Sequence, residues 1–414
     1  MNDGAATRVP RDEPLRDRAQ QLGPELVKLR RDLHRHPELS YREERTAAIA
    51  AKALAELGME PRTGVARTGV VGEMVAGPGP EGDQGPTVAL RADMDALPIQ
   101  EENETDYTST VPGAMHACGH DAHTAALVGA ARILAREARE GRLPPGRLRF
   151  LFQPAEEGMD DEGKSGGRRM VEEGALEGVD AVVGAHVGAH LDPGKVYLRP
   201  GPFFAGSDEF QVEVRGESAH AARPHEGVDA VVLTAQGVVA AQQAVSRRID
   251  PMEPGVLTFG TISGGTVMNV LADRVTLTGT LRYFAPEVRD RLRETLRGAF
   301  QGLEALGARS QVTVVPGYPP VVNEARATEK VLEAFREELG PEVLGEVEPV
   351  LLAEDFSYMA GKAAGVFFWV GAGLPERREH HHPRFDIDES ALPLAAAALA
   401  TAARTLLRGP GHPE

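Results

Sequence analysis

The residues best suited to chemistry surround the single cysteine of the chain, Cys118, in the segment HACGHDAH. Cys118 and His120 are separated by Gly119, which has no side chain to stand between them. A thiolate and an imidazole at this spacing on a turn can face one cation, and both suit zinc or a neighbouring transition metal. The tripeptide also fits a buried cysteine beside a helix-capping histidine, so other parts of the chain must decide.

Further ligand candidates follow two apolar runs and a histidine cluster. Glu156 and Glu157 come after RLRFLF, where adjacent side chains diverge, so that one carboxylate can bind metal while the other faces a water as a general base. The alternative is an ordinary solvated acidic loop. His186 closes the run AVVGAH, and His381 lies in HHHPRFDIDE, where Pro383 would stiffen the turn. Three consecutive histidines also fit a solvated cluster.

Alternating helices and strands would position these residues. Helical patterns cover Arg16 to about Leu57, and later apolar runs with polar C-terminal ends alternate with helices. We predict an α/β fold, a mostly parallel sheet with helices on both faces and a site at the strand ends. Near Ser207 the pattern changes to βαββαβ, the order of a ferredoxin-like α+β sandwich. The predicted parts are a disordered leader (1–21), a discontinuous metal-binding catalytic domain (22–205 and 319–408) and an inserted domain (206–318).

The bulk properties exclude several classes of protein. A length of 414 residues exceeds what one hydrophobic core usually supports. The formal charge of −17 argues against a nucleic-acid partner, because there is no basic excess to neutralise phosphates. No apolar run approaches the roughly 20 residues of a membrane span, and the N-terminus lacks the apolar core of a signal peptide. We therefore expect a cytoplasmic protein with neither membrane nor nucleic-acid partners.

Eight motifs together resemble the amidohydrolase branch of the dinuclear-metal aminoacylase and carboxypeptidase family, which includes N-acyl-amino-acid amidohydrolases, hippurate hydrolases and auxin-conjugate hydrolases. In order along the chain, they are RADMDALP, HACGHDAHTAAL, FQPAEEG, GAH, SAHAARPHEGVDA, GGTVMNVLADRVTLTGTLR, AEDFSYM and HHPRFDIDE. The resemblance extends from about Arg31 to Leu406. It implies a metallopeptidase-like enzyme that hydrolyses the amide bond of N-acyl-L-amino acids, N-acetyl or N-benzoyl compounds among them.

The resemblance also implies a ligand set for two divalent cations, which could be Zn, Mn, Co or Ni. Cys118 would bridge the two ions, and His120, Glu157, His186 and His381 would complete their coordination shells. We choose His381 over the two neighbouring histidines because the family pattern places its ligand two residues before the proline.

Further roles are implied around these ligands. Glu156 would be the general base, which takes a proton from the attacking water and passes it to the departing amine. Asp93, Asp95 and Asp355 would orient ligand histidines from behind. His220, in the inserted domain, matches the position that stabilises the oxyanion, often across a dimer.

Substrate binding and assembly are implied in the same way. Asn269 and Arg282 resemble the groups that hold the free carboxylate of the substrate, a task that suits a planar guanidinium. Without the resemblance, Arg282 would be interpreted as a surface charge on a strand. The inserted domain would act as a lid and dimerisation domain, so we expect a homodimer or a higher homo-oligomer with a small N-acyl amino acid as its substrate.

Three other hypotheses remain. A dipeptidase or carboxypeptidase of the same family needs the same cations and the same carboxylate-binding groups. A cysteine hydrolase would use Cys118 as its nucleophile, but a one-residue gap to His120 makes poor nucleophile–base geometry. A metal-dependent binding protein would have no need of Glu156 beside the ligand carboxylate. The motifs specify neither the acyl group, nor the amino acid, nor the metal.

Overall fold

The computed structural model describes residues 13–79 and 81–409, which form two compact units. The second unit comprises Pro202–Val322 and Glu348–Ser357, and the first comprises the other described residues. No helix in the described part of the chain combines the length and the apolar character needed to cross a membrane.

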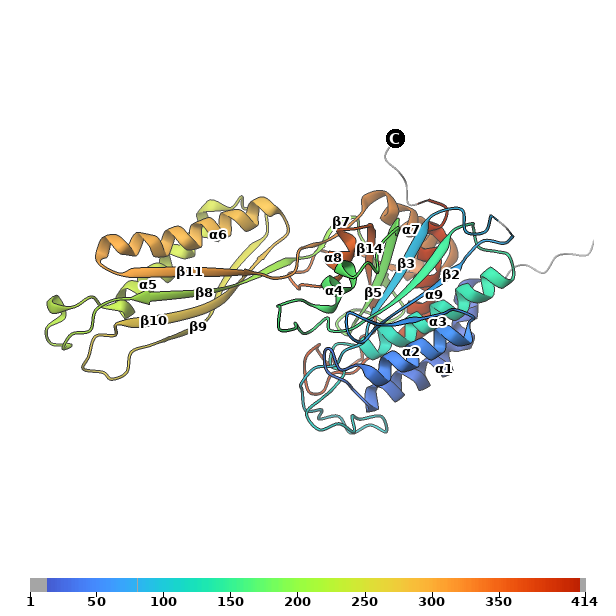
Figure 1. The fold of residues 1–414 in the computed structure, drawn as a ribbon, viewed down its shortest axis with the longest axis horizontal. Helices are drawn as coiled ribbons and strands as arrows, with labels where there is room; N and C mark the ends of the chain where they lie inside the picture. The colour runs from blue at the N-terminus through green and yellow to red at the C-terminus, as the bar shows by residue number, and fades with distance from the viewer. Residues whose placement is uncertain (1–12, 80, 410–414) are drawn as a thin grey trace, which may run out of the picture. The chain divides into compact units, whose positions relative to one another are not determined.

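A mostly parallel sheet forms the centre of the first unit (Figure 1). Its eight strands run in the order β1-β2-β4-β3-β5-β14-β6-β13. Strands β4, β3, β5 and β14 are mutually parallel neighbours, and antiparallel pairs occur toward the edges. The strand bounds are β1 Arg62–Val65, β2 Gly69–Val75, β3 Thr87–Asp93, β4 Arg147–Gln153, β5 Ala181–Gly188, β6 Val196–Tyr197, β13 Leu344–Gly345 and β14 Ala364–Gly371. Every residue of β3 and β5 is buried, as expected for central strands of a parallel sheet.

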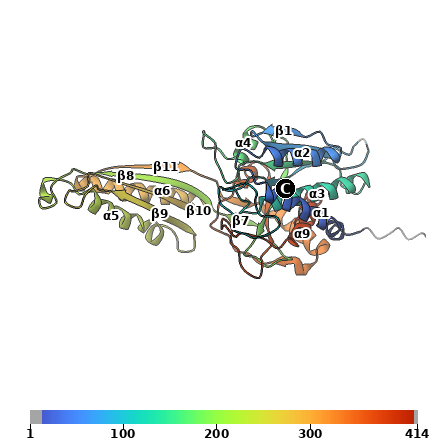
Figure 2. The ribbon, with the colours of Figure 1, turned by 90° about the horizontal axis from the view of Figure 1, so that it is seen from below.

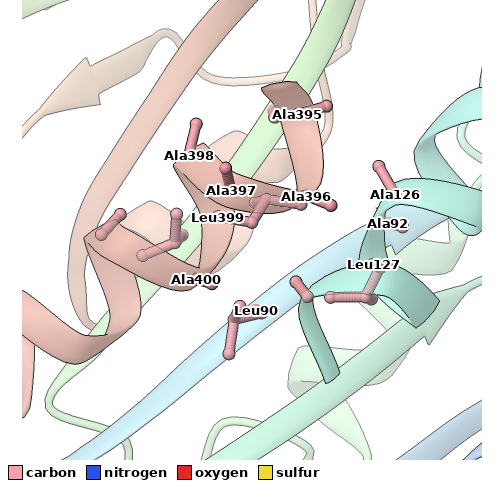
Figure 3. Packing of buried hydrophobic residues seen from close by; sticks show 14 of the residues in the cluster. Leu90, Ala92, Ala126, Leu127, Ala395, Ala396, Ala397, Ala398, Leu399 and Ala400 are labelled. Atoms are coloured by element: carbon pink, nitrogen blue, oxygen red, sulfur yellow. The ribbon is translucent and has the colours of Figure 1, made fainter. Parts of the chain in front are cut away.

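Seven α-helices accompany this sheet in the described chain: α1 Leu15–Arg35, α2 Glu44–Glu56, α3 His120–Arg139, α4 Gly166–Glu172, α7 Ala325–Glu338, α8 Phe356–Ala360 and α9 Ala391–Leu406. Helices α1, α3 and α9 pack against one another. The run Ala395–Ala400 of α9 approaches Leu127 of α3 and Leu90 of β3 (Figure 3). Small side chains on α9 permit this close approach and also favour the helix itself.

Helix α1 begins at Leu15, close to the helical pattern predicted from Arg16 but inside the leader predicted for residues 1–21. The disordered leader proposed for residues 1–21 is wrong for residues 15–21, which are helical, whereas residues 1–12 lie outside the described part of the chain. Leu15 and Ala19 are buried in the core. Arg18 is also buried, and it donates to Glu137 (2.5 Å) and Glu140 (3.0 Å) of α3. These long-range contacts order a segment whose own sequence is highly charged.

The second unit is a βαββαβ sandwich. It contains β8 Gly206–Arg215, α5 Ala230–Ala241, β9 Gly255–Gly264, β10 Arg274–Tyr283, α6 Pro286–Gln301 and β11 Arg309–Pro316. The antiparallel sheet has the order β11-β8-β10-β9, and α5 and α6 contact it and each other (Figure 2). Phe210, Leu277, Leu292 and Phe300 belong to its separate core. Two short strands, β7 Gly201–Phe204 and β12 Val321–Asn323, pair with each other. The predicted fold class is confirmed in both of its parts.

Candidate metal centre

Neighbouring strand ends of the first unit deliver the candidate ligands. Asp93 ends β3, His186 lies near the end of β5, and Glu156 and Glu157 follow β4 after a short turn. Because β4, β3 and β5 are parallel neighbours, their carboxyl ends meet at one edge of the sheet. Helix α3 begins at His120 beside them.

Gly119 shapes the turn that precedes α3. Its φ of 94° lies in the left-handed region, which L-residues with side chains rarely adopt. A Cβ atom at this position would lie only 2.3 Å from Cγ2 of Val187. This turn places the Cys118 Sγ atom 3.5 Å from Nε2 of His186 on β5. Glycine therefore permits both the backbone conformation and the close approach of the turn to β5.

The five predicted ligands lie together around Cys118. Its Sγ atom is within 4.8 Å of ligand atoms from His120 and His186 in one group, and from Glu157 and His381 in another. Because Cys118 is common to both groups, this arrangement suits the bridging role. The His381 Nε2 atom is 2.9 Å from Oε1 of Glu157.

The neighbouring histidines have other contacts. The His380 ring accepts a hydrogen bond from Ala189 N at 3.2 Å. His382 is exposed, and its Nδ1 atom accepts from Arg384 N at 3.1 Å. Among the three consecutive histidines, only His381 belongs to a candidate ligand group of the described residues.

Asp95 forms hydrogen bonds to several of the segments that carry the candidate ligands. One of its oxygens lies 3.2 Å from Nδ1 of His120 and accepts from Glu156 N at 3.0 Å. The other accepts from Glu157 N at 3.0 Å and from the Ser40 hydroxyl at 2.6 Å. One buried carboxylate thus orients a histidine from one ligand segment and the backbone of another.

Asp93 is linked to the ligands through His123, which the sequence analysis did not select. The His123 Nε2 atom accepts from Val187 N at 2.9 Å, so its Nδ1 carries the proton that it donates to Asp93 at 2.6 Å. Arg91 donates to the same carboxylate at 2.8 Å. The signal in the sequence was the spacing of His123 three residues after His120, which puts both on one face of α3.

The charges around Cys118 and His120 favour a positive charge at this site. Burial, together with Glu157 and Glu156, raises the pKa of the Cys118 thiol well above its usual range. Burial would lower the pKa of His120, but Asp93 and Asp95 outweigh it and raise that pKa to about 10. The buried Nε2 atom of His120 makes no hydrogen bond within the described chain. A soft thiolate, imidazoles and carboxylates around an anionic pocket fit divalent transition-metal cations.

The second unit carries His220 and Asn269 close to each other. Residues His220 and Val270 form a β-bridge, and Ala221 N donates to the Asn269 carbonyl at 3.0 Å. The exposed His220 ring accepts from Ala222 N through Nδ1 at 3.1 Å, which leaves Nε2 as the protonated donor. This tautomer suits a group that donates to a developing oxyanion.

Arg282 lies at the other end of β10. The loop with Asn269 leads into Arg274, and Arg282 is eight residues further along the strand, about 26 Å away at the rise of an extended chain. Burial lowers the pKa of Arg282, against the opposing effect of Glu209. The structure therefore does not bring Asn269 and Arg282 of one chain together. Asp355 is buried within the segment Glu348–Ser357, and its predicted role stays a prediction.

Comparisons with known proteins agree with this chemistry. Residues 89–405 match the model of a family described as peptidase family M20/M25/M40. The putative amidohydrolase YhaA of Bacillus subtilis is 40% identical over 387 residues, covering 92% of this chain and 94% of that protein. The N-acetyl-L-cysteine deacetylase of the same organism is 38% identical, with 93% and 89% covered. The crystal structure of B. subtilis YXEP, described as a dinuclear metal-binding peptidase, superposes with a TM-score of 0.80 at 32% identity, covering 94% and 99%.

Proposed function

Because the chain belongs to peptidase family M20/M25/M40 and is a hydrolase of amide or peptide bonds, we propose that it hydrolyses N-acyl-L-amino acids. The resemblance inferred from its motifs is confirmed by the same matches. The observation that carries the proposal is the pairing of two carboxylates: Glu157 lies in the group with Cys118 and His381, and Glu156 lies with Glu157 and His120. The similarity to a deacetylase of an N-acetyl amino acid supports the substrate class.

We propose that two divalent cations would be held by Cys118, His120, Glu157, His186 and His381, with Cys118 as the ligand that both would share. Such cations lower the pKa of a water and polarise the amide carbonyl of the substrate. The segments that carry the proposed ligands are held in place by hydrogen bonds. Asp95 bonds to His120 and to Glu157 N, and His123 accepts from Val187 N, next to His186. The identity of the metal depends on affinity and availability, with Zn, Mn, Co and Ni as candidates.

Glu156 would be the general base of the reaction. It removes a proton from the attacking water and delivers it to the amine nitrogen as the amide bond breaks, so that the amino acid leaves as a neutral amine. Its backbone amide is fixed by Asp95, and its neighbour Glu157 is fixed by the same carboxylate. The fixed backbone at both residues supports the proposal that their side chains have different tasks.

The test begins with chelation and reconstitution of the purified enzyme with single divalent metals. Each form is assayed against N-acetyl, N-benzoyl and indole-acyl amino acids and against dipeptides. Glu156→Gln should keep its metal content while kcat falls by about 10²-fold or more, since general-base catalysis supplies that much. Unchanged turnover in Glu156→Gln would refute the base assignment.

A dipeptidase or carboxypeptidase is the second candidate, because the family is described as a peptidase family. Both candidate activities need the same cations and a group that holds a free carboxylate. The same panel separates them: faster hydrolysis of dipeptides than of every N-acyl amino acid would favour the peptidase.

We further propose a homodimer that forms through the second unit. On α5, Val231, Val232 and Val239 are 50%, 52% and 72% exposed, which is unusual for a helix of such apolar composition. In the same unit, β9 is an edge strand of the described sheet. The separation of Asn269 from Arg282 supports this assembly. These two groups lie far apart in one chain, whereas in a dimer one chain could supply Asn269 and the other Arg282 to the same substrate.

Subunit mixing tests the assembly. His220→Ala and Cys118→Ala should each be inactive alone, and the mixed heterodimer should regain activity if His220 acts across the dimer. Light scattering should give the mass of two chains. A monomeric mass with full activity would contradict the proposal.

A further inference from the structure

The connection between α1 and α2 lies directly against the turn that carries Glu156 and Glu157. Glu43, at the end of this connection, is completely buried. Its Oε1 atom accepts from Tyr41 N and from Ala155 N, both at 2.9 Å, and its Oε2 atom accepts from the Thr68 hydroxyl. Glu43 is therefore bonded to the residue that immediately precedes the proposed general base.

Two carboxylates hold three successive amides of that turn. Glu43 accepts from Ala155 N, and Asp95 accepts from Glu156 N and Glu157 N at 3.0 Å each. Ala155 has a φ of 46°, in the left-handed region that residues with a side chain rarely adopt. A backbone in such a conformation persists only when its surroundings determine it, and the Glu43 bond is one of those determinants.

Packing reinforces the hydrogen bonds. A Cβ atom at Gly158, just after Glu157, would lie 2.6 Å from Oγ and 2.7 Å from Cβ of Ser40. The Tyr41 hydroxyl donates to the Lys164 carbonyl further along the same loop at 2.7 Å. The α1–α2 connection thus touches this loop at its start, after Glu157 and near its end.

We propose that Glu43 is a positioning residue of the hydrolytic reaction, which holds Ala155 in its left-handed conformation and thereby aims Glu156 at the reacting water. Its effect on Glu156 passes through the backbone, because it accepts from Ala155 N, while the Thr68 hydroxyl and Tyr41 N hold the Glu43 carboxylate in place. This inference rests on the proposed function, in which Glu156 is the general base.

The hydrogen-bond pattern identifies which substitution should preserve the role. Both amide bonds converge on one oxygen, so a glutamine can keep them through its carbonyl while its NH₂ group donates to Thr68. Burial, together with Asp95, raises the pKa of Glu43 to about 7. Removal of the Glu43 charge should therefore affect the site little near neutral pH. The property that a variant must retain is the hydrogen-bond geometry.

The experiment compares Glu43→Ala, Glu43→Asp and Glu43→Gln with Glu38→Ala as a matched control. Glu38 lies in the same connection and accepts from Arg45 N (2.9 Å) and Thr46 N (2.8 Å) at the start of α2, away from the Ala155 turn. Each variant is measured for kcat, KM, bound metal and thermal unfolding. Hydrogen exchange of the peptide that spans residues 153–158 gives a readout that does not depend on activity.

In Glu43→Ala and Glu43→Asp, kcat should fall about 10²-fold, the effect of misplacing a reacting group by about 1 Å. KM and metal content should stay near the wild-type values, and exchange at residues 153–158 should increase. Glu43→Gln should keep kcat within about threefold of wild type, the low end of what one ordinary hydrogen bond contributes. Glu38→Ala should lower the unfolding temperature but leave kcat and this exchange unchanged.

Two results would overturn the inference. One is a Glu43→Ala enzyme with wild-type kcat and unchanged exchange at residues 153–158. The other is a fall in kcat that is proportional to the fall in unfolding temperature, by the same relation in the Glu38 and Glu43 variants. Failure of the proposed function is distinct, because it would appear as a wild-type enzyme inactive on the whole substrate panel, while the exchange measurement would still test the positioning.

Discussion

Replacement of Gly119 by alanine should damage the metal centre through two separable effects. The φ of 94° costs an L-residue about 1–2 kcal/mol. The added Cβ atom would lie 2.3 Å from Cγ2 of Val187, and overpacking of this kind costs about 1–3 kcal/mol. We expect Gly119→Ala to lose about 3.5 kcal/mol of unfolding free energy in total, the sum of the middle values of the two ranges. Metal content should fall too, because Cys118 and His120 flank the strained residue.

A double-mutant cycle with Val187→Ala separates the two effects. Truncation of Val187 removes the collision and leaves the backbone strain, so the double variant should be more stable than the sum of the single changes by about 1–3 kcal/mol, the cost of the collision. The assay is urea unfolding of the metal-free proteins, followed by metal analysis after reconstitution. Strict additivity, or a Gly119→Ala protein with wild-type stability and metal content, would refute the reasoning.

Three further predictions concern the ligands and the second unit. Cys118→Ala should lose bound metal as well as activity; a variant that keeps two metals by elemental analysis would overturn the bridging assignment. His381→Ala should lose metal, whereas His382→Ala should behave as wild type in the same analysis, because the His382 ring is exposed and its Nδ1 atom accepts from the nearby Arg384 N. Burial would raise the pKa of Asp208, but Arg289 and Arg293 outweigh that effect and lower it. The ionised carboxylate therefore stabilises the folded protein above the ordinary pKa near 4, and this stabilisation disappears as pH falls through the lowered value. Asp208→Asn should cost about 3 kcal/mol at pH 7, and this difference in urea unfolding should shrink below about pH 4.

The placement of most ligands followed from the sequence because it depends on local patterns. Apolar runs that end in polar residues predicted strands, and the carboxyl ends of parallel strands share one edge of the sheet. That reasoning placed His186 and the Glu156–Glu157 pair at one edge, where the structure also has them. The choice of His381 among three adjacent histidines came from the family resemblance instead.

Residues whose role depends on distant partners could not be recognised in this way. Glu43 and Arg30 lie in strongly charged segments, where each resembles a solvated surface residue. Arg30 is in fact fully buried, and it donates to Asp121 at 2.8 Å and to Asp386 at 3.2 Å. Those partners are far away along the chain, so neither spacing nor periodicity indicates the pairing. The separation of Asn269 from Arg282 likewise required the strand register of the sheet.

The packing of α9 against α1 and α3 has a consequence for the order in which the protein folds during synthesis. Among the helices of the described residues, Ala391–Leu406 is synthesised last, yet it packs against α1, which is synthesised first. The βαββαβ segment of the second unit, by contrast, is continuous in sequence from Gly206 to Pro316. We therefore expect the second unit to complete its sheet while the first unit still waits for Ala391–Leu406 to be synthesised before it can form its native core.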